Sequence, residues 1–99
     1  MRTYSKRNVA NALRQAAAVF GSPIAYDAIA AINQAAGQDE GLYVVAGNTF
    51  AKSVGLTERF RMGTWSTNSP VRAVKKALRQ CAASLEHGEQ LVYGDGYGL

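Results

Sequence analysis

Several features are scarce or missing in this 99-residue chain, and each absence excludes a class of protein. A single cysteine, Cys81, rules out an intramolecular disulfide and argues against a metal cluster. No run approaches the roughly 18 consecutive apolar residues that a transmembrane helix needs. The basic N-terminal segment is not followed by an apolar stretch with a cleavage site, so we expect no signal peptide and a cytoplasmic protein.

Catalytic patterns are missing as well. The one histidine, His87, has no cysteine or aspartate at a spacing typical of nucleophilic catalysis, and Asp39-Glu40 is an adjacent pair in a glycine-flanked loop. The Gly94-Asp95-Gly96 triplet is followed by only three residues, whereas a phosphate-binding loop needs a helix after it. We therefore expect no enzyme, no metal site and no cofactor.

What is present is enough for one small domain over residues 1–99. Apolar residues make up 47% of the chain and charged residues 18%, so the chain can form a modest core. The net charge is +4, and the isoelectric point is about 9.5. This balance suits a polyanionic partner, although an acidic protein surface would fit it equally well.

Two helices are predicted in the first third. Ser5 is a capping residue, and apolar residues then recur at helical spacing up to Phe20, followed by Gly21. The next stretch, SPIAY, reads as a short edge strand. A second helix is predicted over residues 26–36, with Asp27 in its first turn and Gly37 as its stop.

The middle of the chain, residues 37–68, is harder to interpret. LYVVA at residues 42–46 is typical of a buried strand. Asn48 is a candidate cap for a short helix through Val54, and ERFRMGTW alternates charged and bulky residues as a half-buried strand does. We therefore expect strands here, with one short helix between them.

The third helix, residues 70–86, has the clearest pattern. Ser69 is its predicted cap, and Pro70 suits the first helical position. The apolar residues fall at alternating spacings of three and four and form one seam, which consists of Val71, Val74, Leu78, Cys81 and Leu85. The cations Arg72, Lys75, Lys76 and Arg79 lie beside that seam, and no acid precedes Glu86. A merely solvated helix face usually mixes both signs of charge, so this face is a candidate binding surface.

After this helix, residues 90–99 predict a hairpin. LVYGDGYGL places Gly94-Asp95-Gly96 between two short strands, and Asp-Gly is a strong turn signal. The order of elements resembles the winged helix-turn-helix DNA-binding domain of OmpR/PhoB-type response regulators. That family ends in T-V-R-G-x-G-Y-x-L, and LVYGDGYGL matches its Val, both Gly, the Tyr and the final Leu. ALRQAAAVFGSPIAYDAIAAI likewise looks like the family's first helix, short strand and second helix.

The resemblance covers residues 9–36 and 69–99, and residues 37–68 stand between them as an atypical insertion. It implies an α+β fold with three main helices and a C-terminal β-hairpin wing. It also implies a small transcriptional regulator or DNA-organising factor that binds double-stranded DNA. Helix 70–86 would enter the major groove, and the wing 90–99 would touch the backbone. The implied DNA-binding residues are Asn68, Ser69, Arg72, Lys75, Lys76, Arg79, Tyr93 and Asp95.

The alternative is a small protein-binding module, such as a phage- or plasmid-type inhibitor or adaptor. Its support is the aromatic content of residues 42–65, because aromatic residues, Met and Arg are enriched at interfaces. The candidate partner surface consists of Tyr43, Phe60, Arg61 and Trp65. The same surface could make a homodimer, or these residues could form a satellite core.

Overall fold

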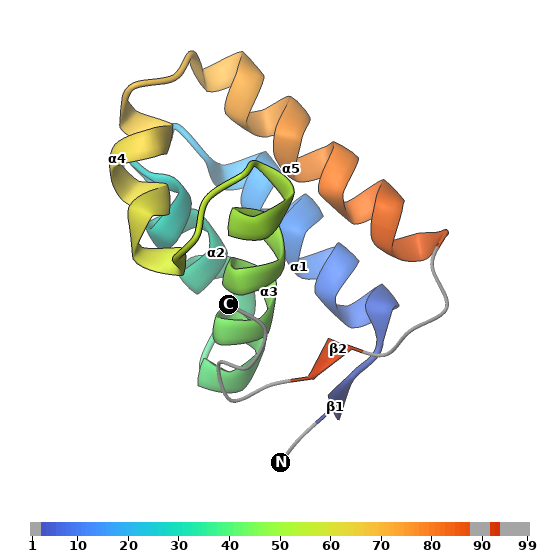
Figure 1. Cartoon of the computed structure of the whole chain (residues 1–99). Helices are drawn as coiled ribbons and strands as arrows, with labels where there is room; N and C mark the ends of the chain where they lie inside the picture. Colours follow the sequence, from blue (N-terminus) through green and yellow to red (C-terminus); the bar gives the residue numbers. More distant parts are fainter. Residues whose placement is uncertain (1–2, 88–91, 94–99) are drawn as a thin grey trace.

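A computed structural model describes residues 3–87 and 92–93 (Figure 1). In chain order, the described elements are β1 (Thr3–Tyr4), α1 (Lys6–Val19), α2 (Ala28–Ala36), α3 (Glu40–Ser53), the 3-10 helix η1 (Arg59–Arg61), α4 (Met62–Thr67), α5 (Val71–Glu86) and β2 (Val92–Tyr93). Helices thus account for nearly all of the described regular structure.

The two helices predicted in the first third are confirmed. Ser5 caps α1, because its hydroxyl accepts a hydrogen bond from the backbone N–H of Asn8. α2 begins two residues later than predicted, since Asp27 is its cap and accepts from the N–H of Ala30 at 2.8 Å. Gly37 ends α2 with a φ of 66°, which a residue with a Cβ rarely adopts. SPIAY lies in the turn between the helices and is not a strand.

The strands predicted in the middle of the chain are wrong. Residues 42–46 belong to α3, which Asp39 caps by accepting from the N–H of Leu42. Asn48 lies inside that helix and does not cap one. The second predicted strand, residues 58–65, is η1 followed by α4. A short apolar run fits a buried helix as well as a buried strand, and here packing on several sides selects the helix.

The predicted α+β winged-helix class is also wrong, because the domain is built of helices. Within residues 3–87 and 92–93 the only strand pairing is the two-residue antiparallel ladder of β1 and β2, with Thr3 opposite Tyr93 and Tyr4 opposite Val92. β2 therefore pairs with the N-terminal strand β1. The predicted wing would instead need β2 to pair with a second C-terminal strand after the turn. The predicted hairpin turn and its second strand lie outside the described residues.

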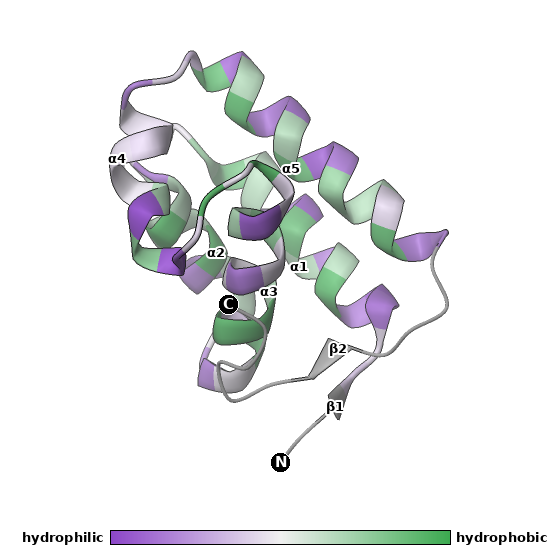
Figure 2. Ribbon diagram, in the orientation of Figure 1, coloured by the Kyte–Doolittle hydropathy of each residue, from purple (hydrophilic) through white to green (hydrophobic). Residues whose placement is uncertain are grey.

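α1 lies at the centre of the helical assembly, in contact with α2, α3 and α5. α1 and α5 run side by side in opposite directions (Figure 1). All the described α-helices contribute buried side chains to the core, α4 through Met62, whereas η1 contributes none. Green hydrophobic segments accordingly alternate with purple hydrophilic ones along α1 and α5 (Figure 2). Many core residues are alanines, which allow the helix backbones to approach closely. The largest fully buried side chains are Phe50, Leu13, Ile32, Met62 and Leu78.

Candidate nucleic-acid interface

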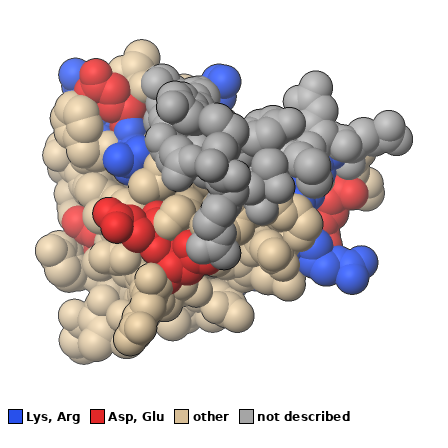
Figure 3. All heavy atoms as spheres, turned by 90° about the horizontal axis from the view of Figure 1, so that it is seen from below, with Lys and Arg blue, Asp and Glu red and all other residues tan. Residues whose placement is uncertain are grey.

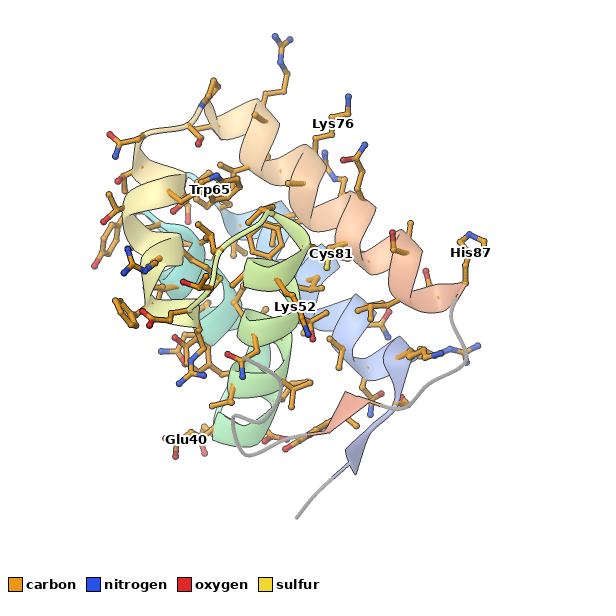
Figure 4. All side chains as sticks on the ribbon, viewed as in Figure 1. Glu40, Lys52, Trp65, Lys76, Cys81 and His87 are labelled. Carbon is orange, nitrogen blue, oxygen red and sulfur yellow. The ribbon has the colours of Figure 1, made fainter. Side chains whose placement is uncertain are left out.

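α5 has two chemically distinct faces. Val74, Leu78 and Cys81 are buried, mostly against α1, and confirm most of the predicted apolar seam. Val71 is an exception: it is 50% exposed at the start of the helix. The opposite face is polar, as the purple segments along α5 show in Figure 2, and Lys76 points away from the body of the protein in Figure 4.

The predicted cations of α5 do come together on that outer side. Arg72, Lys76 and Arg79 are exposed, and Lys75 is half-buried. We call these four residues the α5 cationic face. Arg72 and Lys76 are separated by four positions, as are Lys75 and Arg79, so each pair shares one side of the helix. No ion pair involving these four residues is found within residues 3–87 and 92–93.

The single acid of α5 is neutralised by a neighbouring helix. The guanidinium of Arg14, on α1, donates to the Glu86 carboxylate. This hydrogen bond lowers the pKa of Glu86, and the positive charges of Arg14 and Arg7 act in the same direction. Glu86 therefore does not cancel the positive charge of the α5 cationic face.

The residues before α5 have local roles that the sequence did not reveal. The side-chain amide of Asn68 donates to the carbonyl of Thr64 at 3.0 Å, and the hydroxyl of Ser69 donates to the carbonyl of Trp65 at 2.7 Å. Ser69 is thus not the cap of α5, since Pro70 occupies that position. Both polar side chains close the end of α4, which weakens their predicted role as phosphate ligands.

The remaining predicted DNA-binding residues are at the far end of the chain. Tyr93 is described only as a backbone partner of Thr3 in the β1–β2 ladder. Asp95 lies outside the described residues, as does the turn to which it was assigned. The structure therefore gathers four of the eight predicted DNA-binding residues, all on α5.

The predicted protein-partner surface divides into a packed pair and an exposed pair. Trp65 and Tyr43 are half-buried: the ring of Trp65 meets Phe50 edge-on at 5.6 Å, and the guanidinium of Arg59 lies 5.8 Å from the Tyr43 ring centre. Figure 4 shows Trp65 directed inward from α4. Phe60 is 67% exposed, and Arg61 lies over its ring. Phe60 and Arg61 are therefore the more exposed pair of the four predicted partner residues.

Sequence reasoning missed two features near these residues. Ile24 and Tyr26, in the loop between α1 and α2, are 61% and 70% exposed, whereas we placed them in a strand and a helix. Pro23 could have indicated this loop, because proline favours a turn as well as an edge strand. The second feature is Asn48, which is buried in α3 and accepts a hydrogen bond from Arg59 at 2.8 Å.

Cys81 borders a groove between α3 and α5. The groove has a volume of about 780 Å³, and its lining residues are mainly small or apolar. Cys81 is only 6% exposed, which confirms the predicted role as a small buried apolar residue. Burial raises the pKa of Cys81, although a hydrogen bond with Ser53 opposes this effect. In the described part of the chain, no group of three or more His, Cys, Asp or Glu side chains could hold a metal ion.

The face seen from below carries charges of both signs, in contrast to α5 (Figure 3). Asp39, directly before α3, accepts a hydrogen bond from the hydroxyl of Tyr4. Because Asp39 also caps α3, it ties the N-terminal segment to that helix. Gly41 allows this arrangement, since a Cβ there would collide with the hydroxyl oxygen of Tyr4.

Comparison with protein-family models, with curated proteins and with solved structures found no match to this chain. The resemblance to response regulators therefore rests on short sequence motifs alone, and the fold that it implied is not the one observed. Among the described helices, none combines the length and the apolar character needed to cross a bilayer.

Proposed function

We propose that this protein binds nucleic acid through the α5 cationic face. The observation that carries the proposal is the charge distribution on α5: four cations on its open side, with its one acid held by Arg14. Helix stability does not account for this pattern, because like charges four positions apart destabilise a helix slightly. A polyanion lying on the helix would turn this repulsion into attraction.

The position of α5 supports the same function. The helix has 16 residues, which corresponds to a length of about 24 Å, and its buried side rests on α1. Its outer side is therefore held rigidly and can be approached along its whole length. The proposal needs neither a wing nor a two-helix docking motif, and it concerns contact with the phosphate backbone.

Salt dependence provides the test. Binding of labelled duplex and single-stranded oligonucleotides would be measured by fluorescence anisotropy between 50 and 200 mM salt. Four neutralised phosphates correspond to a slope of about −3.6 in log affinity against log salt for a duplex. The double variant Arg72→Gln/Lys76→Gln should reduce that slope by about 2 and leave the helical circular dichroism spectrum unchanged.

A matched control separates this surface from the general positive charge of the protein. Lys52→Gln/Arg61→Gln removes the same net charge from exposed residues outside α5. The control should leave the slope nearly unchanged. Absence of binding at the lowest salt concentration, or an equal effect of both double variants, would contradict the proposal.

Binding to a protein partner is the competing function, and its exposed elements are Phe60 and Arg61. This alternative predicts no salt-dependent binding to oligonucleotides. It also predicts that replacement of Arg72 and Lys76 has no effect on partner binding. The experiment above therefore discriminates between the two functions.

A further inference from the structure

Among the described residues of α1 and α5, Glu86 is the only acid. α1 carries three cations, and α5 carries four cations together with Glu86. The two helices run side by side in opposite directions (Figure 1). The position of this one acid therefore bears on how the two helices would meet a polyanion.

Glu86 continues the line of cations on α5. Arg72, Arg79 and Glu86 follow one another at intervals of seven residues, which is almost two full turns, so they leave the same side of the helix. Each interval corresponds to about 10.5 Å along the helix axis. Lys76 lies between the first two on that side. Glu86 is therefore the next charged side chain that a polyanion following this row would meet.

Arg14 of α1 lies at the same point, because its guanidinium donates to the Glu86 carboxylate. Both side chains are at the surface, with 43% of Arg14 and 37% of Glu86 exposed. The positive charge of Arg7 also acts on Glu86, and Arg7 shares one side of α1 with Arg14, seven positions later. The row of cations on α5 therefore continues onto α1 through an ion pair.

This ion pair occupies a cation that a phosphate could use. Glu86 is charged at neutral pH, since the hydrogen bond from Arg14 lowers its pKa below the ordinary value. A guanidinium that donates to a carboxylate has fewer N–H groups left for a ligand, and the carboxylate itself repels a nearby phosphate. Exposed ion pairs contribute little to stability, so stability alone gives a weak reason for this pair.

We propose that Glu86 restrains nucleic-acid binding by holding Arg14, a residue of α1 that can bind a phosphate beside the α5 cationic face. With the carboxylate in place, a nucleic acid meets the four cations of α5. When Glu86 is neutral, Arg14 becomes a fifth phosphate contact and the binding surface extends across two helices. This inference rests on the proposed function, because the α5 cationic face supplies the other contacts. It adds a phosphate-binding residue on α1 and an acid that limits the affinity.

The test compares Glu86→Gln with the unmodified protein, by fluorescence anisotropy on the same labelled duplex over the same range of salt. One additional neutralised phosphate should steepen the slope of log affinity against log salt by about 0.9. The variant should therefore bind more tightly at low salt, and its advantage should shrink about 3-fold between 50 and 200 mM. Because Glu86 is exposed, the circular dichroism spectrum should remain unchanged.

A double variant shows whether the gain depends on Arg14. Glu86→Gln/Arg14→Gln should return the slope to that of the unmodified protein, because no cation is released. Glu58→Gln is the matched control, since Glu58 holds Arg61 of η1 in an exposed ion pair at 3.3 Å. The control also removes one acid and frees one arginine, but outside α1 and α5, and it should leave the slope unchanged.

Two results would overturn the inference: a gain that persists in Glu86→Gln/Arg14→Gln, or an equal gain in Glu86→Gln and Glu58→Gln. If Glu86→Gln has no effect while Arg72→Gln/Lys76→Gln weakens binding, the proposed function stands and the inference alone fails. If neither the unmodified protein nor Glu86→Gln binds at the lowest salt concentration, both fail.

Discussion

α3 and α5 have similar lengths but opposite roles in the domain. α3 is enclosed by α1, α2, η1 and α5, and it buries Val45, Ala46 and Phe50 together with the polar side chain of Asn48. α5 buries one narrow stripe and leaves its cations in solvent. The difference shows that the number of packed neighbours, and not helix length, determines whether a helix serves as framework or can offer a binding surface.

The largest expected effect tests this contrast directly. Phe50→Ala removes a fully buried ring from α3 and should lower the free energy of unfolding by about 3–5 kcal/mol. Lys76→Ala, on the open side of α5, should change it by no more than about 0.5 kcal/mol. Urea unfolding followed by circular dichroism measures both values. A large loss of stability in the Lys76→Ala variant would show that the outer side of α5 packs against another part of the protein.

The second prediction concerns polar groups inside the framework. The guanidinium of Arg59 donates to Asn48, and its methylene groups lie against Gly47. Asn48→Ala should cost about 1–3 kcal/mol, because it leaves a half-buried cation without its acceptor.

A double-mutant cycle with Arg59→Ala isolates this interaction from the packing of either side chain. Because the two residues are in direct contact, the cycle should give a coupling free energy of about 1 kcal/mol. A coupling near zero would mean that the hydrogen bond does not hold η1 to α3. The difference between α3 and α5 would then depend on apolar packing alone.

The smallest expected effect concerns the ion pair between Arg14 and Glu86, the last residue of α5. Arg14 lowers the pKa of Glu86 in the folded protein, so the pair stabilises the fold above the ordinary glutamate pKa. This contribution is lost as the pH falls through the lowered pKa. Arg14→Gln should therefore reduce stability slightly at neutral pH and flatten the acid limb of the stability curve.

Chemical denaturation at neutral and acid pH measures that change. Gln15→Ala, on the neighbouring exposed position of α1, is a suitable control because it leaves the ion pair in place. If the Arg14 and Gln15 variants show the same acid dependence, Glu86 does not contribute through this pair.

Sequence patterns predicted α1, α2 and α5 well because these helices have strong local signals. Ser5 and Gly37 mark helix ends, and α5 has a sharp separation of apolar and charged faces. α3 has no such separation, since apolar residues surround most of it, and η1 and α4 are too short for a helical period to show. This is why two helical segments were interpreted as strands.

The candidate site likewise has one part that the sequence predicted and another part that it did not. The cations of α5 could be identified from spacing alone, because a helix places residues four apart on one side. The contact between Gly21 and Val71 could not, since it joins the loop after α1 to the start of α5. The local roles of Asn68 and Ser69 depend on how α4 ends, which no residue pattern disclosed.

The sequence by itself determined that α5 is amphipathic and cationic, because both properties follow from residue identity and the helical repeat. Only the tertiary structure decided that this charge faces solvent, that Arg14 neutralises Glu86, and that the C-terminal Val92–Tyr93 pairs with the N-terminal strand. These outcomes depend on contacts between residues far apart in the chain, and such contacts are selected by how all the buried surfaces fit together.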